Sequence, residues 1–441
     1  MAHQPFHYRT LAEVETELTN LATALPLSQN TGILKDPCTF GAVALRNRLG
    51  ISPMEGVDSL PDGAPSELTR ERYIKFAEGG AALIWFEAVS IVHEGRSSLK
   101  QLYLDRQTLP AFQKLIADMK EAGLKKNGFA PYIIMQANHS GRYSRPNAET
   151  KPEPIIAYHR PEHEQRRPVD SSRIATDDYL EGLEEKFGEA SELTRLAGFD
   201  AVDIKSCHGY LLDELASAYT REGRYGGSFE NRFRLMINAV KNAQQAQTKD
   251  FAVVARLGIY DGFAYPYGFG MARDGSLTPD YEEPIRLVNV LHKELGMPFI
   301  NFTMGDPHQV YHVTRPYDRD IVIPDEHPLE SVARMYQGCG IMKKTFPSLG
   351  VASSAPTYLR QFSPNLAAGA IEQGVCDVAC FGRLSFANPN FANEMLTTGT
   401  LNAEHTCITC SMCSKLIRAG LPTGCVVRNP QTYLGYYKSL Q

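Results

Sequence analysis

Four of the chain's nine cysteines lie close together near its C-terminus. Cys407, Cys410 and Cys413 follow one another at a spacing of three residues, and Cys425 follows after eleven intervening residues. An even spread of nine cysteines over 441 residues would place fewer than one in such a stretch. Three thiolates on one tight loop and a fourth on a separate segment suit the corners of an iron–sulfur cluster. Structural zinc more often takes two separated Cys-x-x-Cys pairs or histidine partners, so the pattern favours a 4Fe-4S cluster, with zinc as the alternative.

A second group of reactive side chains follows the apolar run that begins at Ala201. Lys205, His208 and Tyr210 lie within six residues of one another. A cation or an imidazole donor stabilises an electron-rich oxygen, and a phenol delivers a proton. A single lysine or histidine is more often a structural hydrogen-bonding group, and that alternative stays open. The three residues fall where a buried strand would end, which favours a catalytic role if the strands form a barrel.

Eight short apolar runs alternate with longer amphipathic stretches. The runs are rich in Val, Ile, Leu, Phe and Ala, as in strands buried on both faces, and they cover residues 48–52, 82–87, 130–136, 201–205, 252–258, 299–303, 349–353 and 377–381. Helical patterns lie between them, for example at 109–122, 177–197, 229–246 and 358–373. Eight β-then-α units predict an α/β fold, a (β/α)8 TIM barrel, with its chemistry at the C-terminal ends of the strands.

Three segments flank or interrupt the barrel pattern. Residues 1–40 are expected to form an N-terminal extension with one helix around 11–25, residues 41–400 the barrel, and residues 401–441 the cluster module. Residues 137–176 are too long for an ordinary connection between a strand and a helix. They are rich in Pro, His, Arg and Glu, so we expect a lid over the barrel mouth.

The composition is that of an ordinary soluble enzyme, with 43% hydrophobic and 22% charged residues. The net charge of -5 gives no reason to expect nucleic acid or an anionic membrane as a partner. The N-terminus lacks the compact apolar core of a secretory signal, and no apolar stretch is long enough to span a membrane. The other five cysteines are scattered, which favours a reducing cytoplasm over a disulfide framework. An oxygen-sensitive cluster fits an anaerobic or low-oxygen cell.

Six landmarks along the chain lie at residues 47–54, 136–142, 208–210, 225–232 and 381–383 and in the cysteine module. Together they resemble the Old Yellow Enzyme family of FMN-dependent oxidoreductases. The resemblance is closest to the iron–sulfur branch that includes 2,4-dienoyl-CoA reductase and trimethylamine dehydrogenase, and it runs from about residue 45 to residue 430. Each landmark is weak alone, but their order and spacing are specific.

The resemblance implies an FMN site at the barrel mouth. The residues implied to contact the ring are Ser52, Pro53 and Met54 through their main chain, Ala88 at the ring edge, Gln136 at the pyrimidine end and Arg256 beside N1 and C2=O. A fixed positive charge at Arg256 would stabilise the anionic reduced flavin, and a salt bridge at the rim is the alternative role. The phosphate would be held by Ser353, Ser354, Ala355, Gly382 and Arg383. The family often has glycine in the first of these two turns, where this chain has Ser-Ser-Ala.

The resemblance also assigns chemistry to the segment after the fourth strand. Tyr210 aligns with the family's proton donor, and His308 resembles a second acid of the dienoyl-CoA reductases. Lys205 stands where many relatives have the first histidine of a pair, with His208 as the second. That pair grips a carbonyl or carboxyl oxygen, so Lys205 is expected to stabilise a developing enolate as a point charge. Glu55 stands where relatives often have Thr or Cys near flavin N5, and its role is left open between a flavin contact and a rim salt bridge.

The implied function is that of an FMN-dependent ene-reductase. Reduced FMN would give a hydride from N5 to the β-carbon of an unsaturated acid, enone or thioester, and Tyr210 would protonate the α-carbon. One alternative is an FMN/4Fe-4S dehydrogenase that oxidises an amine or C–H substrate. Another is a non-catalytic electron-carrier subunit. The substrate and a homo-oligomeric state are left open by the sequence.

The route of the electrons is a separate expectation. Relatives with this cysteine module continue into dinucleotide-binding domains, whereas this chain ends soon after Pro430 and has no Gly-x-Gly-x-x-Gly after a strand. Electrons are therefore expected to arrive through the cluster from a flavoprotein or ferredoxin partner. Direct reduction by NAD(P)H at the barrel mouth is the alternative.

Overall fold

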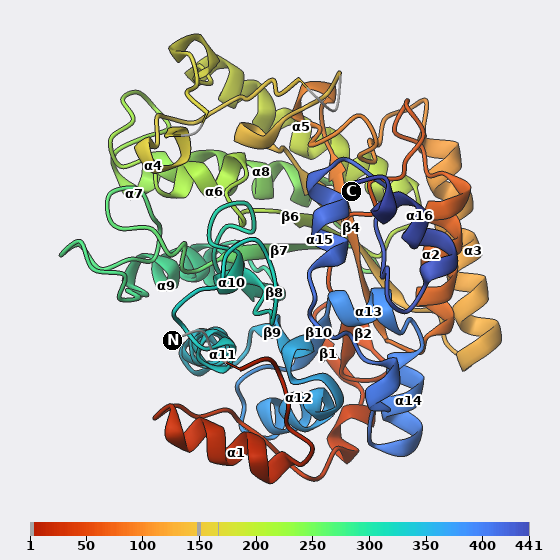
Figure 1. The fold of residues 1–441 in the computed structure, drawn as a ribbon. Helices are drawn as coiled ribbons and strands as arrows, with labels where there is room; N and C mark the ends of the chain where they lie inside the picture. Colours follow the sequence, from red (N-terminus) through yellow and green to blue (C-terminus); the bar gives the residue numbers. More distant parts are fainter. Residues whose placement is uncertain (1–3, 148–150, 166, 441) are drawn as a thin grey trace.

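Eight parallel strands close into a barrel in the order β10-β3-β4-β5-β6-β7-β8-β9. The computed structural model describes residues 4–147, 151–165 and 167–440, and Figure 1 shows its fold. The strands are β3 (Leu49–Ile51), β4 (Leu83–Ser90), β5 (Tyr132–Asn138), β6 (Ala201–Ile204), β7 (Ala252–Gly258), β8 (Phe299–Thr303), β9 (Gly350–Ser353) and β10 (Val378–Phe381). The TIM barrel predicted from the sequence is confirmed, with each strand at its expected place.

Apolar side chains fill the interior of the barrel. Trp85 of β4 stacks on Phe299 of β8 with ring centroids 6.1 Å apart, and Ile134 and Val254 belong to the same buried cluster. All four side chains are buried. This packed layer supports the polar side chains at the C-terminal ends of the strands, as in other barrels of this type.

A short hairpin lies against the N-terminal end of the barrel. Its strands, β1 (Cys38–Phe40) and β2 (Val43–Leu45), pair antiparallel. Phe40 stacks on Phe299 at a centroid distance of 5.7 Å, and β2 contributes residues to the same interior cluster. The sequence did not predict this hairpin, because a three-residue strand is too short to show an alternating pattern.

Helices surround the barrel (Figure 1). The main ones are α1 (Leu11–Asn20), α2 (Glu67–Glu78), α3 (Leu109–Asn127), α5 (Asp177–Leu196), α8 (Arg234–Ala243), α9 (Glu282–Val288), α11 (Pro328–Thr345), α12 (Ser363–Glu372) and α14 (Phe391–Thr398). The helix predicted around 11–25 begins at a capping box, in which Thr10 and Glu13 exchange hydrogen bonds. None of the helices in the described residues is both long and apolar enough to cross a membrane.

Two predicted helices are interrupted. The one at 229–246 divides into α7 (Phe229–Arg232), α8 and a short 3-10 turn, because Phe233 takes a φ of -97° and a ψ of 3°. The one at 358–373 begins with the 3-10 stretch η7 (Pro356–Phe362), in which Arg360 has a φ of +48°. Backbone breaks of this kind leave the hydrophobic pattern intact, so the pattern did not reveal them.

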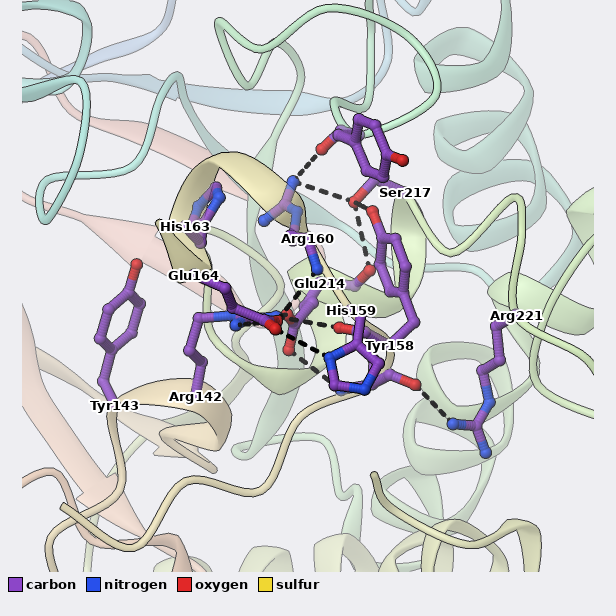
Figure 2. A network of polar contacts seen from close by, with 12 residues as sticks. Arg142, Tyr143, Tyr158, His159, Arg160, His163, Glu164, Glu214, Ser217 and Arg221 are labelled. Atoms are coloured by element: carbon purple, nitrogen blue, oxygen red, sulfur yellow. Dashed lines mark hydrogen bonds and ion pairs between the residues drawn. The ribbon is translucent and has the colours of Figure 1, made fainter. Parts of the chain in front are cut away.

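The predicted lid lies over the loops that follow β6 and β7, as far as its described residues go. Arg142 Nε donates to Glu214 Oε1 at 2.8 Å, and Arg160 forms an ion pair with Asp261 at 3.5 Å. Glu214 belongs to α6 (Leu211–Ala216), directly after β6. Figure 2 shows both arginine side chains among the polar groups that they contact. Buried charge pairs therefore hold this segment on the barrel.

The C-terminal segment packs beside the barrel mouth (Figure 1). It contains α15 (Met412–Arg418) and α16 (Pro430–Lys438). Arg418 at the end of α15 and Arg315 in the loop after β8 both pair with Asp320, at 2.7 and 2.8 Å. The Asp320 side chain is fully buried between them, so the cysteine module and the barrel loop share one charge cluster.

Candidate active site at the barrel mouth

Lys205, His208 and Tyr210 lie together at the C-terminal end of β6. Lys205 directly follows the strand, and its Nζ lies 3.8 Å from the centroid of the Tyr210 ring. His208 and Gly209 make the turn, with φ of +69° and +72°. A Cβ at Gly209 would lie 2.4 Å from Asp306 Oδ2, so only glycine fits this close approach. The structure thus brings the predicted catalytic residues of this segment to one place.

The Lys205 side chain is a buried cation. The residue is 5% exposed, and its ammonium group has no ion pair or hydrogen bond in the described part of the chain, where its contact is the Tyr210 ring. Burial lowers the pKa of Lys205. Because a buried charge is costly without a partner, an anionic group bound beside Lys205 would be strongly favoured.

His208 faces the end of β8, which lies two strands from β6 in the barrel. Its Nε2 lies 3.1 Å from Thr303 Oγ1 at the end of β8. Burial, and then the positive charges of Arg256 and Lys205, lower the pKa of His208 well below its usual value. The imidazole is therefore neutral at ordinary pH and acts as a hydrogen-bonding group.

His308 joins this group from the loop after β8. Its ring stacks on Tyr143 at 3.8 Å and lies 5.8 Å from the Tyr210 ring, edge to face. Burial lowers the pKa of His308 to about 4. Its buried Nε2 has no hydrogen-bond partner among the described residues, so this nitrogen is available to a bound molecule.

Tyr210 is in contact with a carboxylate. Its hydroxyl donates to Glu55 Oε1 at 3.3 Å, and Ser97 Oγ donates to Glu55 Oε2 at 3.1 Å. Burial is the main cause that raises the pKa of Tyr210 well above its usual value, and the Glu55 charge is the second. Neither of the two roles left open for Glu55, a flavin contact and a rim salt bridge, includes this hydrogen bond with Tyr210.

Arg256 at the end of β7 is held by polar groups of the next two strands. Its Nε donates to Asn301 Oδ1 at 2.9 Å, and its Nη2 donates to Ser354 Oγ at 3.4 Å. Ser354 Oγ also donates to Asn301 Oδ1 at 3.1 Å. The Nδ2 of Asn301 is buried without a partner in the described chain. Arg256 is therefore held at the rim, and Asn301 Nδ2 beside it is free to donate. Arg256 forms no salt bridge with any of the described residues.

Asp203 connects the predicted ring contacts from inside the barrel. Its Oδ2 accepts from Gln136 Nε2 at 2.7 Å and from Trp85 Nε1 at 2.8 Å, and its Oδ1 accepts from the Arg256 amide at 2.6 Å. Burial raises the pKa of Asp203 to about 6. Asp203 was not among the site residues predicted from the sequence, although a carboxylate inside an otherwise apolar strand is an available signal.

The phosphate residues predicted from the sequence lie at the ends of β9 and β10. A Cβ at Gly382 would lie 3.0 Å from Met54 Sδ, so the absence of a side chain opens space beside Met54. Arg383 Nη2 donates to Pro316 O at 2.5 Å. Its Nη1 is buried without a partner in the described residues. Ala355 has a φ of +69°, which turns the chain sharply after Ser354.

The other residues predicted to contact FMN already use some of their polar groups in hydrogen bonds within the protein. The Ser52 amide donates to Phe381 O at 3.0 Å, and the Ala88 carbonyl accepts from Gln101 Nε2 at 3.2 Å. The buried Ser353 hydroxyl lies 3.5 Å from Tyr336 OH, away from the mouth. A bound flavin would therefore contact the main chain at these positions through backbone groups other than the Ser52 amide and the Ala88 carbonyl. Pro53 and Met54 are half-buried at the mouth.

The donor set fits FMN. Three buried nitrogen atoms without partners in the described chain (Asn301 Nδ2, His308 Nε2 and Arg383 Nη1) line the same end of the barrel. The guanidinium of Arg383 and the turn at Gly382 suit a phosphate. The guanidinium of Arg256 and the amide of Gln136 suit the electron-accepting end of a flavin ring.

The four C-terminal cysteines line one cavity together with Arg383. All four are free thiols. The Thr409 amide donates to Cys407 Sγ at 3.4 Å, and the Arg428 amide donates to Cys425 Sγ at 3.3 Å. Such N–H···S bonds are characteristic of cluster-ligating thiolates, so the residues fit a cluster.

Among the described residues, no three His, Cys, Asp or Glu side chains are placed to hold a single metal ion. The 4Fe-4S cluster therefore stays a prediction that rests on the four thiols and their shared cavity.

Residues 34–269 match the model of the NADH:flavin oxidoreductase / NADH oxidase family. The chain is 24% identical over 383 residues to the NADH oxidase of Thermoanaerobacter brockii and 27% identical over 375 residues to the cinnamate reductase of Clostridium sporogenes. These matches cover 85% and 82% of this chain and 52% of each relative. The chain thus spans about half the length of these curated relatives.

A similar fold occurs in a solved structure of 2-naphthoyl-CoA reductase bound to 2-naphthoyl-CoA. The two align with a TM-score of 0.72 at 20% identity, over 91% of this chain and 57% of the other. At this identity the likeness shows the fold, and it agrees with the barrel described above.

Proposed function

Because the chain belongs to the NADH:flavin oxidoreductase / NADH oxidase family, we propose that it is an FMN-dependent reductase of activated carbon–carbon double bonds, with unsaturated carboxylates as the substrate class. The observation that carries this proposal is the buried Lys205 ammonium, which lacks a carboxylate partner in the described residues and touches the Tyr210 ring. A substrate carboxylate supplies the missing counter-charge. The similarity to a cinnamate reductase supports the same class.

Flavin, when bound, supplies the two electrons that reduce such a double bond. Gln136 and Arg256 would hold the ring, and both are already oriented by Asp203. Arg383 would hold the phosphate through its free Nη1.

The substrate would be held by Lys205 and His308, with His208 as the third donor. Negative charge builds on the substrate oxygen as the β-carbon is reduced, and a fixed ammonium group beside that oxygen stabilises it. Neutral His308 donates a hydrogen bond through Nε2 without adding a second full charge. Tyr210 would then give its proton to the α-carbon. Each group acts from a position that burial has already fixed.

The electron source is a further part of the proposal. Residues 401–441 would form a 4Fe-4S module that passes electrons to the barrel formed by residues 41–400, and the first 40 residues would pack as an extension. A flavoprotein or a ferredoxin would deliver those electrons. NAD(P)H acting directly at the mouth is the alternative donor.

A dehydrogenase that oxidises an amine is the second candidate. The Glu55 carboxylate beside Tyr210 would suit a substrate ammonium group. The Lys205 charge opposes that choice, because like charges at close range are unfavourable. The direction of electron flow separates the two, since a reductase substrate oxidises reduced flavin and an amine reduces oxidised flavin. An electron carrier without chemistry of its own would do neither.

The test is an anaerobic stopped-flow measurement on the flavin-loaded enzyme. We expect trans-cinnamate or acrylate to reoxidise the dithionite-reduced flavin, and K205M to lower kcat/KM about 10²- to 10³-fold, the typical loss for one charge-stabilising donor. K249M is the matched control, because Lys249 is a surface residue with a side chain 90% exposed. Retention of full activity in K205M, or reduction of oxidised flavin by amines with no response to either acid, would contradict the proposal.

A further inference from the structure

Glu55 links the active-site phenol to the surface of the barrel mouth. One carboxylate oxygen accepts from Tyr210 at 3.3 Å, and the other accepts from Ser97 at 3.1 Å. Tyr210 is 7% exposed, whereas Glu55 and Ser97 are both half-buried. The three groups come from the loops after β6, β3 and β4, so the barrel itself sets their alignment.

Among the described residues, the other neighbours of Tyr210 contact its ring and make no hydrogen bond to its hydroxyl. Lys205 lies over the ring face, and the rings of Tyr143 and His308 meet it edge to face at 5.9 and 5.8 Å. Cys207 and Asp306 lie near enough to affect its charge, but Glu55 is its hydrogen-bond partner in the described residues. Once Tyr210 has given up a proton, Glu55 is the group placed to return one.

We propose that Glu55 and Ser97 form a relay that resupplies the proton of Tyr210 after each turnover. The Tyr210 O–H bond breaks as the C–H bond forms at the substrate α-carbon, which leaves a phenolate. Glu55 takes a proton from solvent through the Ser97 hydroxyl and passes it to that phenolate. The tyrosine O–H bond is restored, Glu55 returns to its carboxylate form, and no electrons are exchanged in these steps.

The energetics favour this direction of transfer. The pKa of Tyr210 is raised by burial and by the Glu55 charge, so a phenolate beside an ionised Glu55 places two like charges in a poorly solvated site. Protonation of Glu55 from solvent relieves that repulsion. A glutamine at position 55 can make a hydrogen bond to Tyr210, but its amide cannot take up a proton from solvent and pass it to the phenolate.

The relay rests on the proposed reductase function, and the experiment separates the two. Reduced enzyme is mixed with trans-cinnamate, acrylate or 2-cyclohexenone, and the first turnover is compared with steady-state turnover. In E55Q we expect the steady-state rate to fall at least about 10-fold further than the first-turnover rate, since general acid–base groups contribute about 10²- to 10⁴-fold. In E55A, added formate should restore much of the steady-state rate because it occupies the vacated space.

E184Q is the matched control. Glu184 of α5 also accepts from a tyrosine, Tyr225, at 2.7 Å, but this contact joins an outer helix to the loop before α7. Its two rates should stay in the wild-type ratio. Equal slowing of both rates in E55Q, together with no response of E55A to formate, would assign Glu55 a structural role and overturn the relay alone. A wild-type flavin that none of the three alkenes reoxidises would overturn the proposed function and the relay with it.

Discussion

Asp203 is a single carboxylate with three donors inside the barrel, from Trp85, Gln136 and the Arg256 amide. Because Gln136 Nε2 is committed to Asp203, the carbonyl oxygen of that amide is left for a bound molecule. The same carboxylate fixes the backbone from which the Arg256 side chain extends. We infer that Asp203 positions both predicted ring contacts.

The titration of Asp203 predicts a pH-dependent stability. Burial raises its pKa in the folded protein to about 6, above about 3.9 in an unfolded chain. The folded protein therefore binds the extra proton between these values, and this contribution to stability, up to about 3 kcal/mol, is present below pH 3.9 and is lost as the pH rises through 6. In D203N that dependence should disappear.

Guanidinium unfolding of wild type and D203N between pH 4 and 7 checks this expectation. The difference between the two unfolding free energies should change by up to about 3 kcal/mol over the interval. D250N, which alters an 81%-exposed side chain, should run parallel to wild type. Parallel curves for D203N and wild type would mean that Asp203 does not hold a proton at mildly acidic pH in the folded protein.

The sequence showed the candidate catalytic residues better than their partners. Lys205, His208 and Tyr210 were accessible because they follow one strand, and strand ends meet at the barrel mouth. The contact between Glu55 and Tyr210 was not accessible, because it joins loops 155 residues apart in sequence. Asn301 was missed for a different reason, since a polar residue inside an apolar run does not disturb the strand pattern.

The lid segment shows how one element is held by buried charges. Arg142 donates from Nη1 to Glu164 within the lid at 2.9 Å and from Nε to Glu214 of α6 at 2.8 Å. It also donates to Tyr158 O at 2.9 Å (Figure 2). The Glu214 side chain has no exposed surface. Its charge therefore depends on Arg142 for compensation.

We expect R142M to destabilise the protein by about 3–5 kcal/mol, the usual cost of leaving one member of a buried pair alone. Thermal or guanidinium unfolding measures the loss, and limited proteolysis should place new cleavage in the lid. R142M/E214Q should recover part of the stability, since glutamine keeps the hydrogen bond from the Ala157 amide without a charge.

R195M provides the contrast on α5. Arg195 and Glu192 form a surface pair whose side chains are 37% and 46% exposed, so its loss should cost less than about 1 kcal/mol. A loss of similar size in R142M would mean that the lid is not held by the Arg142 network.

The helices and strands could be predicted from the sequence where their buried residues form a regular apolar pattern. The eight barrel strands are buried on both faces almost throughout, so each appears as a mostly apolar run despite single polar residues such as Asp203 and Asn301. The hairpin at Cys38–Phe40 and Val43–Leu45 has no such length, and its role depends on contact with Phe299 far along the chain. The kink at Arg360 is a backbone event that side-chain type does not report.

At the scale of the whole molecule, the cysteine module and the barrel meet where the flavin phosphate is predicted to lie. Arg383 lies in both places, since it follows β10 and lines the cavity of the four cysteines. The Thr423 amide donates to Gly56 O at 2.7 Å, two residues beyond Met54. These contacts bring the predicted electron entry close to the predicted flavin site.

Replacement of one cysteine should therefore remove the cluster and leave the barrel loaded. Wild type purified without oxygen should contain about four irons and four sulfides per chain together with one FMN. We expect C413S to lose the iron and sulfide but to keep the flavin, because Gly382, Arg256 and Gln136 belong to the barrel.

C38S is the matched control, since Cys38 lies in the hairpin at the opposite end of the barrel and should leave both cofactors in place. Electron delivery from a chemically reduced ferredoxin should fail in C413S, while dithionite still reduces its flavin. Zinc in place of iron would make the module structural, and electrons would then have to enter from NAD(P)H at the mouth. Loss of FMN along with the iron in C413S would instead show that the phosphate turn depends on the cysteine module for its shape, which the position of Arg383 between the two would explain.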